Sequence, residues 1–253
     1  MSFFRDLWLV FQRYFLLFIR NPAWVVIGVV QPILYLVLFA PLLKSIAQSP
    51  GFPPGGAYNV FVPGLLVQLG LFGASGVGFG LISDLRFGIV ERLRVTPVSR
   101  LALLLGRSLR DILTIVIQAL IIVVCSLPFG LDIHPVGLLV MLALVALIGL
   151  LFSSISYALA LWLKDENSFA PLTFTATLPL LLLSGVLLPL SLAPAWLRDI
   201  AKANPLSYAV DAGRAIFNDH VGDVSVAQGV AVMAVLAVIA VVVAARAMGR
   251  AVA

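Results

Sequence analysis

The chain has 253 residues, of which 62% are hydrophobic and 11% charged, and its mean hydropathy is +1.15. An ordinary soluble domain carries about 25% charged residues, so this composition excludes a protein whose whole surface faces water. The formal net charge of +5 does not indicate nucleic-acid binding, because the basic residues lie between apolar blocks and form no basic patch interleaved with aromatic side chains.

Residues 1–21 predict an amphipathic helix that lies in the plane of the membrane surface. At about 100° per residue, six polar side chains fall within an arc of about 120° and the phenylalanines lie elsewhere; the six are Ser2, Arg5, Asp6, Gln12, Arg13 and Arg20. This segment is poorly suited to crossing the membrane, since Arg5 and Arg13 would each cost at least about 2.5–3.5 kcal/mol at depth. A secretory signal is the alternative, and Arg13 argues against it because it interrupts the apolar stretch.

Six apolar blocks follow, each long enough to cross the hydrocarbon core of a membrane. They cover residues 23–43, 60–82, 109–127, 136–163, 169–190 and 226–245. The shortest block still reaches about 29 Å at a rise of about 1.5 Å per residue, close to a hydrocarbon thickness of about 30 Å. We therefore predict an all-α integral membrane protein, in which residues 1–253 form one transmembrane domain with six membrane-spanning helices.

The distribution of Lys and Arg predicts the orientation, because cytoplasmic loops carry an excess of these residues. Six spans place both termini on one side of the membrane. Of the 16 basic residues, all but four lie on that side, and the four exceptions are Lys44, Arg198, Lys202 and Arg214. We therefore expect both termini in the cytoplasm and the protein in the cell membrane.

Two glutamines, Gln31 and Gln68, and the proline Pro179 are candidates for a pathway or hinge within the spans. The glutamines could contact a substrate or form interhelical hydrogen bonds. Pro179 is expected to kink the fifth span, either as a hinge that lines the pathway or simply to improve packing. No block has an ionisable residue near its centre, which disfavours ion-coupled carriers and favours an external energy source.

Motifs for catalysis, metal binding and nucleotide binding are absent from the sequence. It contains no H-E-x-x-H, no G-x-S-x-G and no set of Cys and His with metal-ligand spacing. It also lacks a G-x-x-x-x-G-K-[ST] loop, which would cradle the phosphates of ATP. We therefore expect a protein that is not itself an enzyme and binds no cofactor or metal, so another chain supplies the ATPase if ATP drives it.

Residues 87–96 predict a short amphipathic helix on the cytoplasmic side. Its apolar positions share one side of the helix, Glu91, Arg92 and Arg94 occupy the other, and Pro97 ends it. The simplest role for this helix is to supply the positive charge of a cytoplasmic loop.

The stretch between the fifth and sixth spans is too long for a simple turn. Within it, Asn204 and Pro205 are typical of the N-cap and first residue of a helix that continues to Phe217. Asp211 and Arg214 are three residues apart, so they could pair on one face of this helix. The helix need not cross the membrane.

These two segments resemble parts of the type-2 ABC transporter permeases, and among these the membrane subunits of daunorubicin-resistance-like drug exporters. The stretch E-R-L-R-V-T-P-V-S-R at residues 91–100 is similar to the coupling helix of that family. The stretch N-P-L-S-Y-A-V-D-A-G-R at residues 204–214 is similar to its signature between spans five and six. The resemblance covers essentially the whole chain.

The resemblance implies that two six-span subunits, identical or related, assemble around a central pathway in the lipid bilayer. Each coupling helix would dock on a separately encoded ATPase subunit, which would bind ATP and Mg²⁺. The contacts expected with that subunit are Glu91, Arg92, Arg94 and Thr96. The outer gate, a helix that dips back into the membrane, would comprise Asn204, Pro205, Tyr208, Asp211 and Arg214.

The expected function is therefore ATP-driven export of an amphipathic or hydrophobic substrate, such as a drug or a lipid. A lipid or polysaccharide exporter of the same family is an alternative to a drug exporter. A self-sufficient channel or secondary carrier is disfavoured because the predicted coupling helix would have nothing to dock with. A membrane-embedded enzyme is disfavoured because the sequence lacks a catalytic motif.

Overall fold

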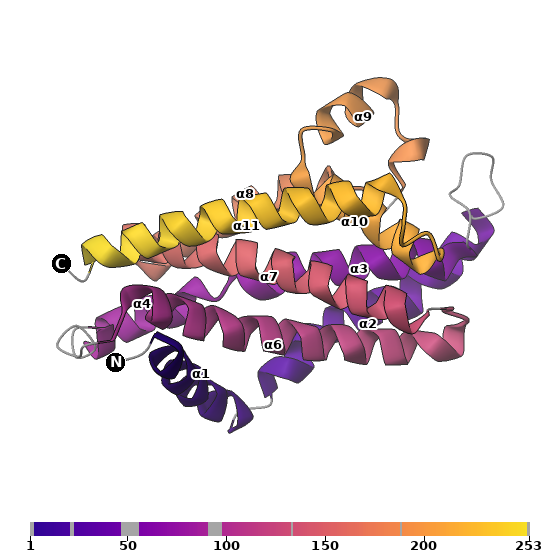
Figure 1. The fold of residues 1–253 in the computed structure, drawn as a ribbon. Helices are drawn as coiled ribbons and strands as arrows, with labels where there is room; N and C mark the ends of the chain where they lie inside the picture. Colours follow the sequence, from indigo (N-terminus) through magenta and orange to yellow (C-terminus); the bar gives the residue numbers. More distant parts are fainter. Residues whose placement is uncertain are drawn as a thin grey trace.

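The computed structural model describes residues 3–20, 23–46, 56–90, 98–132, 134–187 and 189–251, and these residues form helices and no strands. The α-helices in chain order are α1 (Phe3–Ile19), α2 (Ala23–Ile46), α3 (Gly56–Ser75), α4 (Gly78–Arg86), α6 (Arg100–Ser126), α7 (Pro135–Leu163), α8 (Glu166–Leu182), α9 (Ala195–Ala201), α10 (Pro205–Phe217) and α11 (Val224–Ala251). Two short 3₁₀-helices are η1 (Leu127–Phe129) and η2 (Leu190–Leu192). The long helices α3, α6, α7 and α11 run side by side as a bundle (Figure 1).

Four stretches of the described chain are long and apolar enough to cross a membrane. They are Gly56–Arg86, Arg100–Phe129, Pro135–Leu163 and Val224–Gly249, and α2 adds a shorter apolar stretch, Val25–Phe39. Each of these five overlaps one of the six predicted blocks. The predicted fifth span, residues 169–190, differs most, because α8 ends at Leu182 and has only 17 residues. The coarse prediction of an all-helical, multi-pass membrane protein is confirmed.

Both termini lie at one end of the bundle, which we call the inner end, and α9 and α10 lie at the opposite, outer end (Figure 1). Helix α1 crosses the inner part of α6 at an angle instead of joining the bundle. Gly106 allows this close crossing, since a Cβ there would lie 2.7 Å from Val10 Cγ1. Phe4 and Trp8 on α1 remain exposed, while Asp6 is buried. The face that α1 turns to the bundle is thus not purely apolar.

The second predicted block is broken, because α3 ends at Ser75 and α4 begins at Gly78. The hydroxyl of Ser156, on α7, donates to the Ser75 carbonyl at 2.6 Å and accepts from the Gly78 N–H at 2.9 Å. These bonds satisfy backbone groups that the interruption leaves without helical partners. Only glycine fits at position 78, since a Cβ would lie 2.5 Å from the ring of Phe169 and 2.7 Å from the Ser156 carbonyl.

Helix α6 begins nine residues before the predicted start of the third block, residue 109. Ser99 is its N-cap, and its hydroxyl accepts from the Ala102 N–H at 3.1 Å. The predicted block begins later because it leaves out Arg107, a charged residue that the helix includes. In the structure Arg107 and Arg110 both have carboxylate partners, which offset the cost of placing a charge in the helix bundle.

Buried apolar side chains form two main clusters along the bundle. The outer core draws on α2, α3, α6, α7, α10 and α11. The inner core lies toward the end that holds both termini and consists of Leu81, Ile82, Val90, Leu104, Tyr157, Ala160, Leu161, Phe169, Ala244 and Met248. Helix α11 packs along α7 and contributes to both clusters.

Candidate functional site

The outer end of the bundle is built from the segment that joins α8 to α11. After α8 the chain makes a turn in which Gly185 has a φ of +76°, a conformation that favours glycine. The short helix α9 projects away from the bundle, whereas α10 packs against α3, α7 and α11 (Figure 1). The segment therefore has one exposed helix and one that is held tightly.

Asn204 fixes the start of α10. Its side-chain oxygen accepts from the Leu206 N–H at 3.0 Å, and Pro205 occupies the first helical position, so the predicted N-cap and proline are confirmed. The Asn204 amide also donates to the Leu180 carbonyl on α8 at 2.7 Å. One buried side chain thus caps α10 and joins it to the end of α8.

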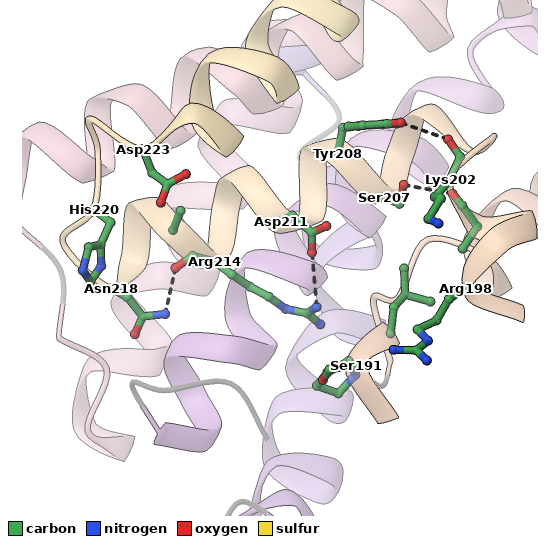
Figure 2. Close-up of a pocket in the computed structure, with 14 residues that line it drawn as sticks. Ser191, Arg198, Lys202, Ser207, Tyr208, Asp211, Arg214, Asn218, His220 and Asp223 are labelled. Atoms are coloured by element: carbon green, nitrogen blue, oxygen red, sulfur yellow. Dashed lines mark hydrogen bonds and ion pairs between the residues drawn. The ribbon is translucent and has the colours of Figure 1, made fainter. Parts of the chain in front are cut away.

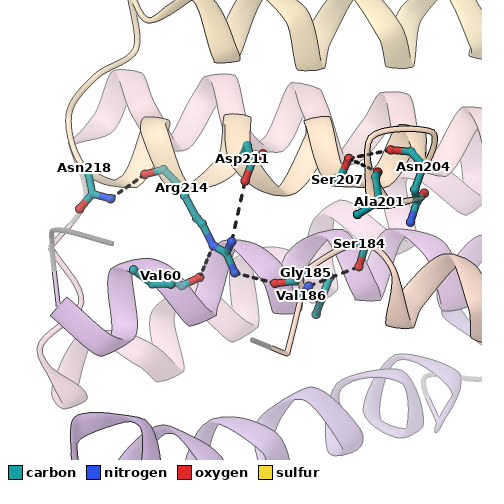
Figure 3. A network of polar contacts seen from close by, with 10 residues as sticks. All are labelled: Val60, Ser184, Gly185, Val186, Ala201, Asn204, Ser207, Asp211, Arg214 and Asn218. Atoms are coloured by element: carbon teal, nitrogen blue, oxygen red, sulfur yellow. Dashed lines mark hydrogen bonds and ion pairs between the residues drawn. The ribbon is translucent and has the colours of Figure 1, made fainter. Parts of the chain in front are cut away.

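Arg214 is the central charged residue of this end, and only 9% of its side chain is exposed. Its guanidinium donates to the Val60 carbonyl on α3 at 3.2 Å and to the Gly185 carbonyl at 2.7 Å (Figure 3). The predicted pairing with Asp211 is present as a longer contact of 3.8 Å. Burial lowers the pKa of Arg214 to about 10, so it remains a cation at neutral pH.

Glycines allow these elements to approach closely. A Cβ at Gly229 on α11 would lie 2.6 Å from the Tyr208 carbonyl on α10. A Cβ at Gly64 on α3 would lie 2.8 Å from the Val186 carbonyl in the turn after α8. The backbones of α10 and of this turn are therefore in direct contact with the bundle, which restricts their movement.

A cavity of about 610 Å³ opens between α9, α10 and the loop that leads to α11 (Figure 2). Its charged and histidine side chains are Arg198, Lys202, Asp211, Arg214, His220 and Asp223. Lys202 is paired with Asp199 at 2.7 Å, and the Tyr208 hydroxyl donates to the Lys202 carbonyl at 3.1 Å. The cavity thus combines charges of both signs with an aromatic hydroxyl.

The five predicted gate residues all lie at the outer end, where some line the cavity and others form the start of α10. Tyr208, Asp211 and Arg214 line the cavity, and Asn204 and Pro205 begin the helix that carries them. All five lie on or next to α10 at the outer end.

The three pathway candidates are not brought together, and none lines the described wall of this cavity. Gln31 is exposed on α2, and its amide donates to the Tyr35 hydroxyl at 3.4 Å. Gln68 is 2% exposed within α3. Pro179 lies inside α8, three residues before its last residue, Leu182. A different glutamine, Gln118 on α6, donates to the Val25 carbonyl on α2 at 3.3 Å, which is the interhelical role weighed for this residue type.

The predicted contacts with an ATPase subunit lie outside the described residues. They are Glu91, Arg92, Arg94 and Thr96. The described chain resumes just before Ser99, the N-cap of α6.

An ion-pair cluster at the inner end was not predicted from the sequence. The guanidinium of Arg107, on α6, pairs with the carboxylate of Asp84 on α4. The Tyr14 hydroxyl, on α1, donates to the same carboxylate at 3.1 Å, and its ring centroid lies 4.4 Å from the Arg107 guanidinium carbon. This cluster joins α1, α4 and α6 through side chains that are mostly buried.

A second buried contact follows one turn later on α6. The Tyr157 hydroxyl, on α7, donates to the Asp111 carboxylate, and Arg110 pairs with the other oxygen of that carboxylate at 3.2 Å. The sequence offered a signal, because Arg107 and Asp111 are four residues apart and share a helix face. Counting basic residues only as signals of membrane orientation hides this signal, because it gives no reason to look for a buried carboxylate partner.

Comparisons with known proteins agree with this architecture. The family model for ABC-2 type transporters matches residues 5–218. The transport permease ycf38 of Porphyra purpurea is 33% identical over 213 residues, which cover 82% of this chain and 72% of the relative.

Two bacterial relatives carry names that refer to drug resistance. The daunorubicin resistance ABC transporter permease DrrB1 of Streptomyces coeruleorubidus is 26% identical over 83% of this chain and 74% of its own length. The doxorubicin resistance ABC transporter permease DrrC of Mycobacterium tuberculosis is 23% identical over 77% of this chain and 70% of its own length.

Proposed function

The chain belongs to the ABC-2 type transporter family, and from this premise we propose that it is the membrane subunit of an ATP-driven exporter. The observation that carries the proposal is the family match over residues 5–218, together with relatives named as ABC transporter permeases. The missing nucleotide-binding loop is consistent with a division of labour between subunits. In this arrangement ATP and Mg²⁺ bind to a separately encoded ATPase subunit.

The proposed topology has six spans with both termini in the cytoplasm. Four long apolar stretches and the shorter one in α2 support five of these spans. Helix α8 would be the sixth membrane element, extended by the turn and η2 that follow it. Helix α1 would lie in the membrane surface with Phe4 and Trp8 toward lipid, as their exposure favours.

The ATPase subunit would dock on the predicted coupling helix, within which we call residues 91–97 the coupling segment. The described elements on either side of it, α4 and the N-cap of α6, lie at the inner end of the bundle. Glu91, Arg92, Arg94 and Thr96 are its proposed contacts. Two such membrane subunits, identical or related, would form the complete exporter with two ATPase subunits.

The outer site would act as the gate on the far side of the membrane. Tyr208, Asp211 and Arg214 line its cavity, and the held position of α10 supports a gate that opens by movement of neighbouring elements. Helix α10 would dip back from the outer surface toward the bundle.

We propose an amphipathic or hydrophobic substrate. The names of two relatives refer to resistance to daunorubicin and doxorubicin, which supports a drug-like molecule. A lipid or polysaccharide export function is the alternative within the same family.

Co-purification with a nucleotide-binding subunit tests the division of labour. The chain is expressed with and without the product of an adjacent reading frame that encodes a P-loop ATPase. We expect stable co-purification, ATP hydrolysis by the complex and no hydrolysis by the chain alone. ATP hydrolysis by the isolated chain would contradict the proposal.

Daunorubicin, a phospholipid and a soluble oligosaccharide are then compared as stimulators of ATP hydrolysis by the reconstituted complex. Stimulation by daunorubicin would support a drug exporter. Stimulation by the phospholipid or oligosaccharide alone would support the alternative substrate class.

A further inference from the structure

Buried serines on α7 separate the inner core from the outer core. Phe152 belongs to the outer core and Tyr157 to the inner core. Between them, Ser153, Ser154 and Ser156 are all at most 3% exposed. Three buried hydroxyls within four residues are unusual for a helix inside an apolar bundle, because each needs a hydrogen-bond partner.

Buried polar residues also separate the inner core from the outer core on α6. Leu104 belongs to the inner core and Ile115 to the outer core. The buried residues Arg107, Ser108 and Asp111 lie between them. The helix thus passes from one apolar cluster to the other through about two turns that carry charged and hydroxyl groups.

The interruption between α3 and α4 lies at the corresponding boundary. Ala74 belongs to the outer core and Leu81 to the inner core. Ser75 and Gly78 flank the interruption, and Ser156 of α7 bonds to the backbone of both. Three neighbouring elements therefore change from outer to inner core through polar groups, and contacts between these groups connect the helices.

Several polar atoms of this boundary lack a partner within the described residues. They include Arg107 Nη1, Ser108 Oγ and Ser154 Oγ, which are buried and have no hydrogen bond. An unpaired buried polar group costs free energy comparable to a lost hydrogen bond, and internal water molecules commonly satisfy such groups. All three lie in the stretches of α6 and α7 that separate the inner core from the outer core, so water within this boundary could satisfy them together.

We propose that this boundary is a hydrated polar layer and that it is the joint at which the inner part of the bundle moves against the outer part. The polar layer consists of Ser75, Arg107, Ser108, Asp111, Ser154 and Ser156. Its water molecules bond to the unpaired atoms of Arg107, Ser108 and Ser154. The proposed movement, unlike the proposed hydration, rests on the proposed function, in which an ATPase subunit acts on residues 91–97.

The bundle would move at the polar layer because apolar contacts and water-mediated contacts respond differently to a displacement. Interdigitated apolar side chains resist small displacements, because a shift opens voids or creates overlaps. Hydroxyls bonded through water can exchange partners after a shift, at a small cost in free energy. A polar layer between two packed cores is therefore the plane along which the bundle can most easily rearrange.

The inner core is connected to the coupling segment. Val90, the last described residue before that segment, is buried in the inner core. Asp84 on α4 pairs with Arg107 and accepts a hydrogen bond from Tyr14, so α1 and α6 are both connected to α4, which contributes to the inner core. A force applied at residues 91–97 would reach these elements before it reaches the outer core.

Hydration is tested on the purified chain with hydroxyl radicals generated from water by X-rays. Tyr157 borders the polar layer and is 2% exposed, while Tyr58 in the outer core is 6% exposed. We expect Tyr157 to be oxidised several-fold faster than Tyr58, because internal water is the radical source. Equal or slower oxidation of Tyr157 would overturn the hydrated layer.

Two matched variants test whether the oxidation rate of Tyr157 depends on the unpaired hydroxyls of Ser108 and Ser154. The double change Ser108→Ala with Ser154→Ala removes two unpaired hydroxyls and should slow oxidation of Tyr157 several-fold. Ser126→Ala is the control, since this buried serine on α6 already donates to the Ile122 carbonyl at 2.7 Å. Should the double variant fail to fold, each single serine variant is used in its place. The same Tyr157 oxidation rate in the layer variant and the control would contradict the proposal.

Movement is tested by electron-spin distance measurements on the complex with its ATPase subunit, after replacement of Cys125. One label pair spans the layer, at Phe87 and Val136, and a control pair lies within the inner part, at Phe87 and Trp162. All three positions are at least 64% exposed. Trapping with ATP and vanadate should change the distance across the layer and leave the control distance unchanged.

The outcomes separate this inference from the proposed function. Equal changes in the label-to-label distance of both pairs, or a change in the control distance alone, would contradict movement at the polar layer. Absence of any ATPase subunit that binds the chain would defeat the proposed function and the movement with it. The oxidation of Tyr157 decides the hydrated layer in either case.

Discussion

The guanidinium of Arg214 contacts two backbone carbonyls from different elements, Val60 on α3 and Gly185 in the turn after α8. Both carbonyls would lose a charged donor if this side chain were removed, and hydrogen bonds to charged groups contribute about 1.5–3 kcal/mol each. At the scale of single residues, Arg214 therefore does more to hold the outer end than its long contact with Asp211 does.

Arg214→Met should lower the free energy of unfolding by about 2–4 kcal/mol, since it leaves two buried carbonyls without a donor. Arg214→Lys keeps the charge but lacks the fork that reaches both carbonyls, so we expect an intermediate loss. Thermal unfolding in detergent measures the effect. Arg198→Met is the control, because Arg198 is exposed and its loss should change stability by less than about 0.5 kcal/mol. Equal stability of Arg214→Met and Arg198→Met would contradict this role.

Charges of the coupling segment give a second residue-scale prediction. Glu91→Ala and Arg92→Ala should each abolish export yet leave membrane insertion intact, because truncating one partner of a buried interfacial pair costs about 2–5 kcal/mol. If these residues served only membrane orientation, Glu91→Ala would be harmless, since acidic residues contribute little to it. Export and co-purification of the ATPase subunit are measured for each variant. Normal export by both would refute the contact assignment.

At the scale of elements, the packing of α4 depends on a single small residue. Gly78 lies where the ring of Phe169 and the backbone of α7 leave no room for a Cβ, whereas a Cβ added at Gly80 would meet no atom within 4 Å. The two glycines belong to the same helix, so they differ mainly in the space around them.

Gly78→Ala should lower the free energy of unfolding by about 1–3 kcal/mol, because the added methyl forces the Phe169 ring or the α7 backbone to shift. Gly80→Ala should be neutral or stabilise by up to about 1 kcal/mol, as expected for alanine in an open helical position. Thermal unfolding of both variants provides the comparison. A loss of stability in Gly80→Ala as large as in Gly78→Ala would count against the close packing of α4.

Elements differ in how well their sequence predicts them. Residues 136–163 were predicted almost to the ends of α7, because no charged or breaking residue interrupts that block. The start of α6 was not predicted because Arg107 lies near it, and the carboxylate that pairs with Arg107, that of Asp84, is distant in sequence. The early end of α8 depends on a turn at Gly185 that packs against α3. The dipeptide Ser184-Gly185 is a turn signal within the leucine run, and the prediction did not use it.

The candidate site was predictable in part for the same reasons. Asn204 and Pro205 act locally, so their roles as N-cap and first helical residue could be derived from the sequence. The two backbone carbonyls that bind Arg214 could not, since they come from segments 154 and 29 residues away. The contacts of the serines in the polar layer could not be predicted either, because a hydroxyl on a membrane helix has no single expected partner.

At the scale of the whole molecule, the proposed topology places Ser99 in the cytoplasm and Gly222 outside. Both positions are exposed, and a Cβ at Gly222 would meet no atom within 4 Å. In a chain with Cys125 replaced, an impermeant thiol reagent should label Gly222→Cys in sealed cells and leave Ser99→Cys unlabelled until the membrane is opened. Labelling of Ser99→Cys from outside would reverse the orientation.

The central claim is that this chain moves a substrate only with an ATPase subunit and ATP. Inside-out membrane vesicles that contain both subunits are given daunorubicin, and the drug that accumulates inside them is measured with ATP, without ATP and with the ATPase subunit omitted. We predict accumulation only when both subunits and ATP are present. Accumulation by the chain alone, or equal accumulation without ATP, would contradict the account.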